Sequence, residues 1–168
     1  MPAVKTPMLT IAVCAALLVA GCGGDDDSST ESAASAEATT TESSAAKTKP
    51  KVTVPKGAPP KQLEVKELEE GSGAEAKAGD EVTVQYVGVN YKNGKVFDSS
   101  WSRNEPFSFG LGAGEVIPGW DQGVEGMKVG GRRELIIPPE LAYGPEGSPP
   151  AIGPNETLIF VIDLLEVG

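Results

Sequence analysis

The stretch Glu115-Val116-Ile117-Pro118-Gly119-Trp120 predicts the start of a short helix that aims an indole at an apolar pocket. Its proline suits the first helical position, where the missing N–H costs no hydrogen bond. Val124 and Met127 follow Trp120 at helical spacing and extend one apolar stripe. The glycine pair at 130–131 is predicted to end this segment. The rest of the folded part would then supply the walls of the pocket.

Alternating apolar residues on both sides of this stretch predict strands. The predicted strands cover residues 63–68, 81–89, 96–97, 107–109, 133–138 and 157–167. The first has a mixed pattern that indicates an edge strand, and an Asn93-Gly94 pair predicts a hairpin between the second and the third. Two strands place their large apolar residues on one face: Val82, Val84 and Tyr86 in the second, and Leu158, Phe160, Ile162 and Leu164 in the last. One short helix on a curved antiparallel sheet is an α+β fold.

A long loop, residues 139–156, separates the last two predicted strands. A loop of this length inside a small domain is usually functional. Because it carries Tyr143 and Ile152, we expect a flap that folds back over something apolar.

The composition excludes several classes of function. The chain has 168 residues, a net charge of −10 and no histidine, so it has no basic footprint for nucleic acid and no Ser-His-Asp or Cys-His nucleophile system. The two cysteines, Cys14 and Cys22, lie in the first 22 residues. We therefore predict a folded part without disulfide, metal site or thiol nucleophile.

Residues 1–22 are predicted to be a targeting segment. Lys5 and the amino terminus are positive, and residues 8–20 form an apolar run that is too short to span a membrane. The run ends in Leu18-Val19-Ala20-Gly21-Cys22, which resembles the lipobox of bacterial lipoproteins. Lipidation of Cys22 would hold the protein at a bacterial membrane, in the cell envelope outside the cytoplasm. The alternative is a plain secretory signal with an incidental cysteine.

Residues 23–60 are predicted to be a linker before a domain at 61–168. Residues 23–46 contain nothing apolar larger than alanine, so they cannot bury enough surface to fold. Residues 47–60 hold four lysines and four prolines, which favour an extended chain. The plainer interpretation is a solvated linker; the alternative is that its lysines rest on anionic lipid headgroups.

Six short motifs identify a family. They are Val84-Gln85-Tyr86-Val87-Gly88, Phe97-Asp98-Ser99-Ser100, Arg103-Asn104-Glu105-Pro106-Phe107, Val116-Ile117-Pro118-Gly119-Trp120, Leu141-Ala142-Tyr143-Gly144 and Leu158-Ile159-Phe160. In this order and at these spacings they closely resemble the FKBP family of peptidyl-prolyl cis-trans isomerases, over nearly all of residues 63–167. The family fold, an antiparallel sheet wrapped around a short helix, agrees with the pattern of strands and helix.

The resemblance implies a ligand pocket and a role for each residue that lines it. The implied lining is Tyr86, Phe97, Asp98, Arg103, Phe107, Val116, Ile117, Trp120, Tyr143, Ile152 and Phe160. Trp120 would be the floor, with the apolar residues as walls around a prolyl ring. The Ile117 N–H and the Tyr143 hydroxyl would bind substrate carbonyls. Asp98, held by Tyr86 and Arg103, would act electrostatically. Ser148 departs from the family, because the best-known members carry histidine there.

Rotation about an X-Pro bond makes and breaks no bond, so the implied reaction requires no cofactor. We predict an isomerase that acts as a monomer on proline-containing exported polypeptides and also binds macrolides. Two alternatives stay open: a binding module that keeps the pocket without turnover, and an envelope lipoprotein without this activity. Without the family spacing, a structural role is the alternative for each residue: plain core for the aromatic residues, a turn-forming aspartate for Asp98 and a structural anchor for Tyr143.

Overall fold

The computed structural model describes residues 47–168. The predicted targeting segment, the lipobox with Cys22 and the first part of the predicted linker lie outside the described residues. Within residues 47–168, no helix is both long enough and apolar enough to cross a membrane.

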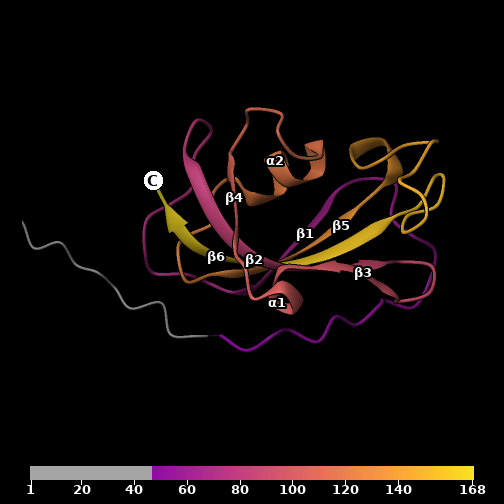
Figure 1. Ribbon diagram of the computed structural model, residues 1–168, viewed down its shortest axis with the longest axis horizontal. Coiled ribbons are helices and arrows are strands. Elements are labelled where there is room, and N and C mark those ends of the chain that lie inside the picture. The colour runs from indigo at the N-terminus through magenta and orange to yellow at the C-terminus, as the bar shows by residue number, and fades with distance from the viewer. Residues whose placement is uncertain (1–46) are drawn as a thin grey trace, which may run out of the picture. The chain divides into compact units, whose positions relative to one another are not determined.

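Six strands form one antiparallel sheet (Figure 1). They are β1 (Glu64–Glu69), β2 (Glu81–Asn90), β3 (Val96–Ser99), β4 (Phe107–Gly110), β5 (Arg132–Ile137) and β6 (Leu158–Val167). The order is β1-β5-β6-β2-β3, and β4 pairs with β2 beside this path. The predicted α+β fold is confirmed, with β1 at an edge as its pattern indicated. The Asn93-Gly94 pair lies in the β2–β3 hairpin, where Gly94 has a φ of +67° and its N–H donates to the Asn90 carbonyl.

The inner face of the sheet carries the main core. The side chains of Val82 and Val84 on β2 are fully buried, and so are those of the alternating apolar residues of β6. They pack with Trp120 of α2 (Pro118–Val124), which lies across this face. The predicted alternation of both strands is therefore confirmed. The flap also folds back as expected, because Ile152 is buried in this core and its N–H donates to the Ser148 carbonyl.

Two glycines let α2 lie directly on β5. A Cβ atom at Gly119 would lie 2.4 Å from Cγ2 of Ile137, and one at Gly123 would lie 2.5 Å from Cδ1 of Leu135. Real Cβ atoms do not approach other atoms so closely, so any larger residue would push the helix off the sheet. The close approach brings Trp120 against the sheet.

The end of the helix differs from the prediction. The stripe predicted a segment that runs to the glycine pair at 130–131, but α2 ends at Val124. Glu125 has a ψ of 134°, and Gly126 has a φ of +77°. The Gly126 N–H donates to the Ala76 carbonyl at 2.9 Å, so the chain leaves the helix to pair with the segment before β2. Met127 is nevertheless buried in the core, as its spacing predicted.

Residues 47–60 also differ from the predicted solvated linker, and we call this segment the strap. It runs along the side of the sheet opposite α2 (Figure 1). Val52 and Val54 pack on a second buried cluster, which lies on the outer face of the sheet. A composition of lysine and proline gave no sign of this, because two valines carry the contact. Beside the strap lies α1 (Ser100–Arg103), a single helical turn that the sequence patterns did not predict.

Candidate functional site

A cavity of about 500 Å³ opens between α2, the neighbouring strands and the long loop. Its lining is Tyr86, Phe97, Asp98, Phe107, Glu115, Val116, Ile117, Pro118, Trp120, Tyr143 and Phe160. Five of these residues come from α2 and the loop before it, one comes from the long loop, and strands of the sheet supply the other five. The stretch that begins at Glu115 therefore contributes almost half of the lining.

Trp120 forms the centre of an aromatic cluster under the cavity. Its ring meets those of Tyr86 and Phe160 edge to face, with centroids 5.0 and 5.2 Å apart. Such edge-to-face pairs are a favoured aromatic geometry. The indole is 4% exposed, and its Nε1–H has no hydrogen-bond partner in the described part of the chain. The cluster fixes the indole by contacts on several sides.

Phe97 and Phe160 form one wall, and a glycine lets them close. Their rings meet edge to face with centroids 5.5 Å apart. A Cβ atom at Gly88 would lie 2.6 Å from Cζ of Phe97 and 2.8 Å from Cε1 of Phe160. Phe107 stands on the other side, stacked on Phe109 with centroids 5.7 Å apart. Phe107 is 37% exposed, so this wall is open to solvent.

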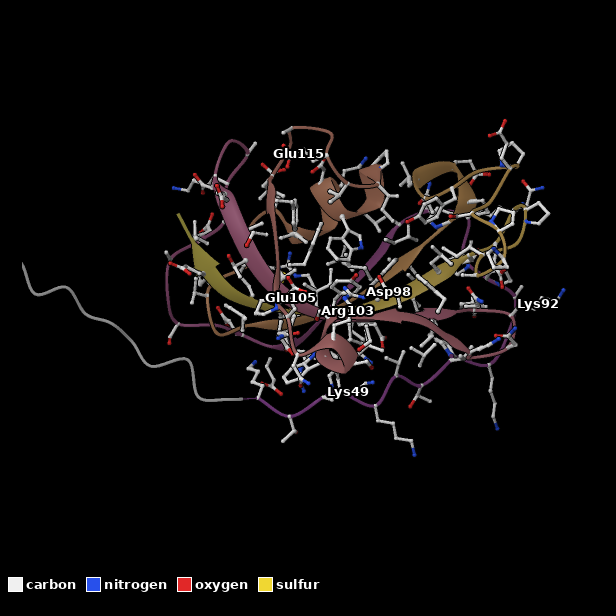
Figure 2. All side chains as sticks on the ribbon, viewed as in Figure 1. Lys49, Lys92, Asp98, Arg103, Glu105 and Glu115 are labelled. Carbon is white, nitrogen blue, oxygen red and sulfur yellow. The ribbon has the colours of Figure 1, made fainter. Side chains whose placement is uncertain are left out.

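The Asp98 carboxylate stands at the edge of the apolar cavity. Asp98 accepts hydrogen bonds from the Tyr86 hydroxyl, from an Nη1–H of Arg103 and, at 2.7 Å, from the Ser99 N–H. Arg103 also donates from Nη2 to the Tyr86 hydroxyl oxygen at 3.0 Å. Figure 2 shows Asp98 and Arg103 next to each other beside α1. These partners fix both oxygens of the carboxylate.

The partners also set the protonation states. Partial burial by itself would raise the pKa of Asp98, but the hydrogen bonds from Tyr86, Arg103 and the Ser99 N–H outweigh it and hold the pKa below its usual value. Burial, followed by the hydrogen bond to Asp98, raises the pKa of Tyr86. Burial, with the nearby charge of Asp98, raises the pKa of Tyr143. At neutral pH the site therefore presents Asp98 as a carboxylate beside the neutral phenols of Tyr86 and Tyr143.

Two polar hydrogens remain available to a ligand. Within residues 47–168, neither the Ile117 N–H nor the Tyr143 hydroxyl has a hydrogen-bond partner. Ile117 precedes Pro118 and caps the helix in an extended conformation, with a φ of −61° and a ψ of 144°. Both groups belong to residues that line the cavity. Elsewhere in the described range, no group of three or more His, Cys, Asp or Glu residues could hold a metal ion.

The structure brings together the predicted site residues, with two differences. Arg103 does not line the cavity but contacts the Asp98 carboxylate that does. Ile152 lies in the core beneath the flap, because the Ser148–Ile152 bridge turns it inward. Glu115 and Pro118 line the cavity and were not predicted. Their positions on either side of Val116-Ile117 in the sequence could have indicated that they line the cavity.

Comparison with known proteins decides the family. Residues 73–165 match the family model of the FKBP-type peptidyl-prolyl cis-trans isomerases. The chain belongs to this family. It is 58% identical over 120 residues to an FK506-binding protein of Streptomyces anulatus. This match covers 71% of this chain and 97% of that protein. It is 50% identical over 117 residues to a probable FK506-binding protein of Corynebacterium glutamicum, which covers 70% and 97%.

The fold comparison agrees with the sequence comparison. The crystal structure of AtFKBP13 superposes with a TM-score of 0.59 at 42% identity, over 63% of this chain and 93% of that chain. The open antiparallel sheet with a short helix is shared with this neighbour. The chain is therefore a peptidyl-prolyl cis-trans isomerase.

Proposed function

We propose that this isomerase accelerates rotation about X-Pro bonds in exported polypeptides by binding the twisted amide in the aromatic cavity. The observation that carries the proposal is an apolar cup, floored by Trp120, with the charged Asp98 at its edge. Bond rotation makes and breaks no covalent bond, so it requires neither a metal ion nor an activated nucleophile.

The barrier explains why an apolar cup helps. Rotation about a peptide bond must cross about 18–20 kcal/mol, and an X-Pro bond takes tens to hundreds of seconds unaided. Twisting removes the resonance of the amide, and with it the charge separation that water stabilises. An apolar cavity therefore favours the twisted form over both planar forms. Each tenfold increase in rate requires that the cavity favour the twisted form by only about 1.4 kcal/mol.

The two available donors orient the substrate. In this mechanism the Ile117 N–H and the Tyr143 hydroxyl donate to carbonyl oxygens on either side of the prolyl ring. Pro118 and the first turn of α2 hold Ile117 in place, because the Trp120 N–H donates to the Ile117 carbonyl at 2.8 Å. The donors are thus fixed before the substrate arrives, which lowers the entropy cost of orienting it.

Asp98 acts on the rotating carbonyl through its charge. Tyr86 and Arg103 hold the carboxylate at one position, so its field does not need to reorganise during rotation. Tyr143 lies close enough to Asp98 for the carboxylate to raise its pKa. The carboxylate and the hydroxyl therefore act on the same bound peptide.

The proposal includes a place in the cell and a second ligand. The lipobox-like sequence supports lipidation of Cys22, which would tether a monomeric isomerase to a bacterial membrane outside the cytoplasm, where exported chains fold. Replacement Cys22→Ser is expected to release the protein from the membrane fraction; retention there would contradict the tether. The names of the two bacterial relatives support binding of a macrolide such as FK506 in the same cavity.

The catalytic proposal is tested with a short X-Pro peptide. We expect Phe97→Ala and Asp98→Ala each to lower kcat/KM by about tenfold or more, since each removes an interaction with the twisted amide. Lys95→Ala, an exposed change one residue before β3, is the matched control. A macrolide that competes for the cavity should inhibit the wild type. If both variants isomerise the peptide at the wild-type rate, the proposed use of the cavity is wrong.

A further inference from the structure

The outer face of β2 changes character along its length. Thr83 and Gln85 are polar, but Val87 and Val89 are 1% and 2% exposed. The outer face of an antiparallel sheet usually meets water and carries polar residues. An apolar outer face is stable only if another part of the protein covers it. The change from polar to apolar residues therefore marks where another segment begins to cover the outer face of β2.

The strap is that cover. Val52 and Val54 are half-buried and pack on a cluster formed by Val87, Val89, Tyr91, Ile136 and Ile159. The residues between and beside them, such as Thr53, are exposed. The Tyr91 hydroxyl donates to the Ala58 carbonyl at 3.4 Å. The strap thus alternates between inward and outward residues as a strand would.

The beginning of the strap covers a buried ion pair. Asp163 is buried on the outer face and accepts hydrogen bonds from Arg132 at 2.5 and 2.8 Å. Arg132 also donates to the Thr48 carbonyl at 2.9 Å. The Lys47 ammonium lies 2.7 Å from the Glu69 carboxylate and 4.0 Å from that of Asp163. These contacts join the strap to β1, β5 and β6.

The strap also contacts the turn that carries Arg103. The Lys49 ammonium donates to the Ser102 hydroxyl at 2.9 Å, and Figure 2 shows Lys49 on the side of α1 away from Asp98. Trp101 packs on the same outer cluster as the two strap valines. On its other side, α1 is joined to β2, because the Tyr86 N–H donates to the Ser100 hydroxyl at 2.7 Å. The turn is therefore held between the strap and the sheet.

The match to a bacterial relative extends into the strap. The predicted domain, residues 61–168, has 108 residues, whereas the match to the Streptomyces anulatus protein covers 120. At least about ten matched residues must therefore precede residue 61, and these belong to the strap. The family model itself begins only at residue 73.

We propose that the strap is a positioning element of the enzyme: it fixes α1 so that Arg103 holds Asp98 at the edge of the cavity. The proposal rests on the proposed role of Asp98 in catalysis. Val52 reaches Trp101 through the outer cluster on which both pack, and Lys49 binds Ser102, the residue before Arg103. A segment that only links the domain to a membrane would need none of these contacts.

The test compares an inward with an outward residue of the strap in the full-length chain. Val52→Asp places a charge on the apolar cluster, while Thr53→Asp adds the same charge on the exposed side. We expect Val52→Asp to lower kcat/KM for the X-Pro peptide about fivefold at temperatures where circular dichroism shows a folded protein. It should also shift the amide NMR signals of residues 99–104. Thr53→Asp should do neither.

Milder variants keep the proposal testable if Val52→Asp does not fold. Val52→Thr keeps the shape of the side chain, Lys49→Ala removes only the bond to Ser102, and Val52→Ile should keep full activity. If Val52→Thr and Lys49→Ala lower the melting temperature but leave kcat/KM and the α1 amide signals unchanged in the folded protein, the strap only stabilises the domain and the proposal is wrong.

A double-mutant cycle separates this proposal from the proposed role of Asp98 in catalysis, on which it rests. If the strap acts through Asp98, Val52→Asp should cause no further loss of activity in an Asp98→Asn background. An unchanged kcat/KM in Asp98→Asn alone would contradict the role of Asp98. The shifts of the α1 amides would still report whether the strap positions α1. An equal loss in both backgrounds would show that the strap acts by another route.

Discussion

The inner and outer faces of the same sheet are both apolar, but only one of them is left open. On the inner face, α2 has seven residues and covers part of the sheet, so a cavity remains beside Trp120. On the outer face, the strap and α1 cover the apolar part. The faces also differ at single polar groups: within residues 47–168 the Tyr143 hydroxyl at the cavity has no hydrogen-bond partner, whereas Asp163 on the outer face is paired with Arg132. Incomplete cover on one side of a well-packed sheet is what makes a binding site.

Strand β6 shows how both faces depend on one strand. Leu158, Phe160 and Ile162 pack on the inner core, while Ile159 and Val161 are buried on the outer side. Strands buried on both faces are nearly continuous apolar runs, and residues 158–162 of β6 are such a run. A change on the outer face can therefore be compared with one on the inner face of the same strand.

The largest effect should come from breaking the ion pair on the outer face. Replacement of Arg132 by Met leaves the Asp163 carboxylate buried without its partner, and the free energy of unfolding should fall by about 3–5 kcal/mol. Urea denaturation measures this change.

The double variant Arg132→Met/Asp163→Leu is the control for this prediction. It removes both charges, so much of the lost stability should return. If Arg132→Met unfolds no more easily than the wild type, water reaches Asp163 and the outer face is not closed. That result would remove the difference between the two faces at this position.

A matched pair on the outer face of β2 should give a smaller effect. Val87→Thr keeps the shape but buries a hydroxyl under the strap, and we expect a loss of about 1–3 kcal/mol. Thr83→Val makes the reverse change where the strap gives no cover. It removes the exposed contact between the Thr83 and Ser108 hydroxyls, 2.9 Å apart, and should stay within about 0.5 kcal/mol of the wild type. Equal losses of stability in the two variants, measured by thermal unfolding, would show that the two ends of this face do not differ.

The sequence predicted the inner face better than the outer face, for a physical reason. Period-two alternation identified the residues of β2 and β6 that face the core, and motif spacing identified the aromatic lining around Trp120. The length of α2 was wrong because the stripe continued to Met127, although Gly126 ends the helix by pairing with Ala76.

The strap was harder to predict because its contact depends on tertiary structure. Its lysines and prolines favour an extended chain, and extended chains have no periodicity that distinguishes a docked segment from a free one. The informative signal lay elsewhere, in the apolar outer residues Val87 and Val89, which need cover. For the same reason Arg103 was wrongly placed on the lining: the expected contact with Asp98 is present, but the fold keeps Arg103 out of the cavity.

The smallest effect should be the change in activity when acid protonates Asp98. Asp98 lies at the open cavity and Asp163 on the closed outer face, and the two carboxylates differ in exposure. The Asp98 side chain is 40% exposed and that of Asp163 is 1% exposed, so water and salt weaken the contribution of Asp98 to stability. Because its hydrogen bonds lower its pKa below the ordinary 3.8, its stabilising contribution is present above that value. It is lost as the pH falls through the lower pKa of the folded state. We therefore expect kcat/KM to stay level down to about pH 4 and to fall only below it, with Asp98→Asn lacking this acid limb. Circular dichroism at each pH separates loss of charge from unfolding. An acid limb near pH 6 in the folded wild type would mean that Tyr86 and Arg103 do not hold the carboxylate in its charged form.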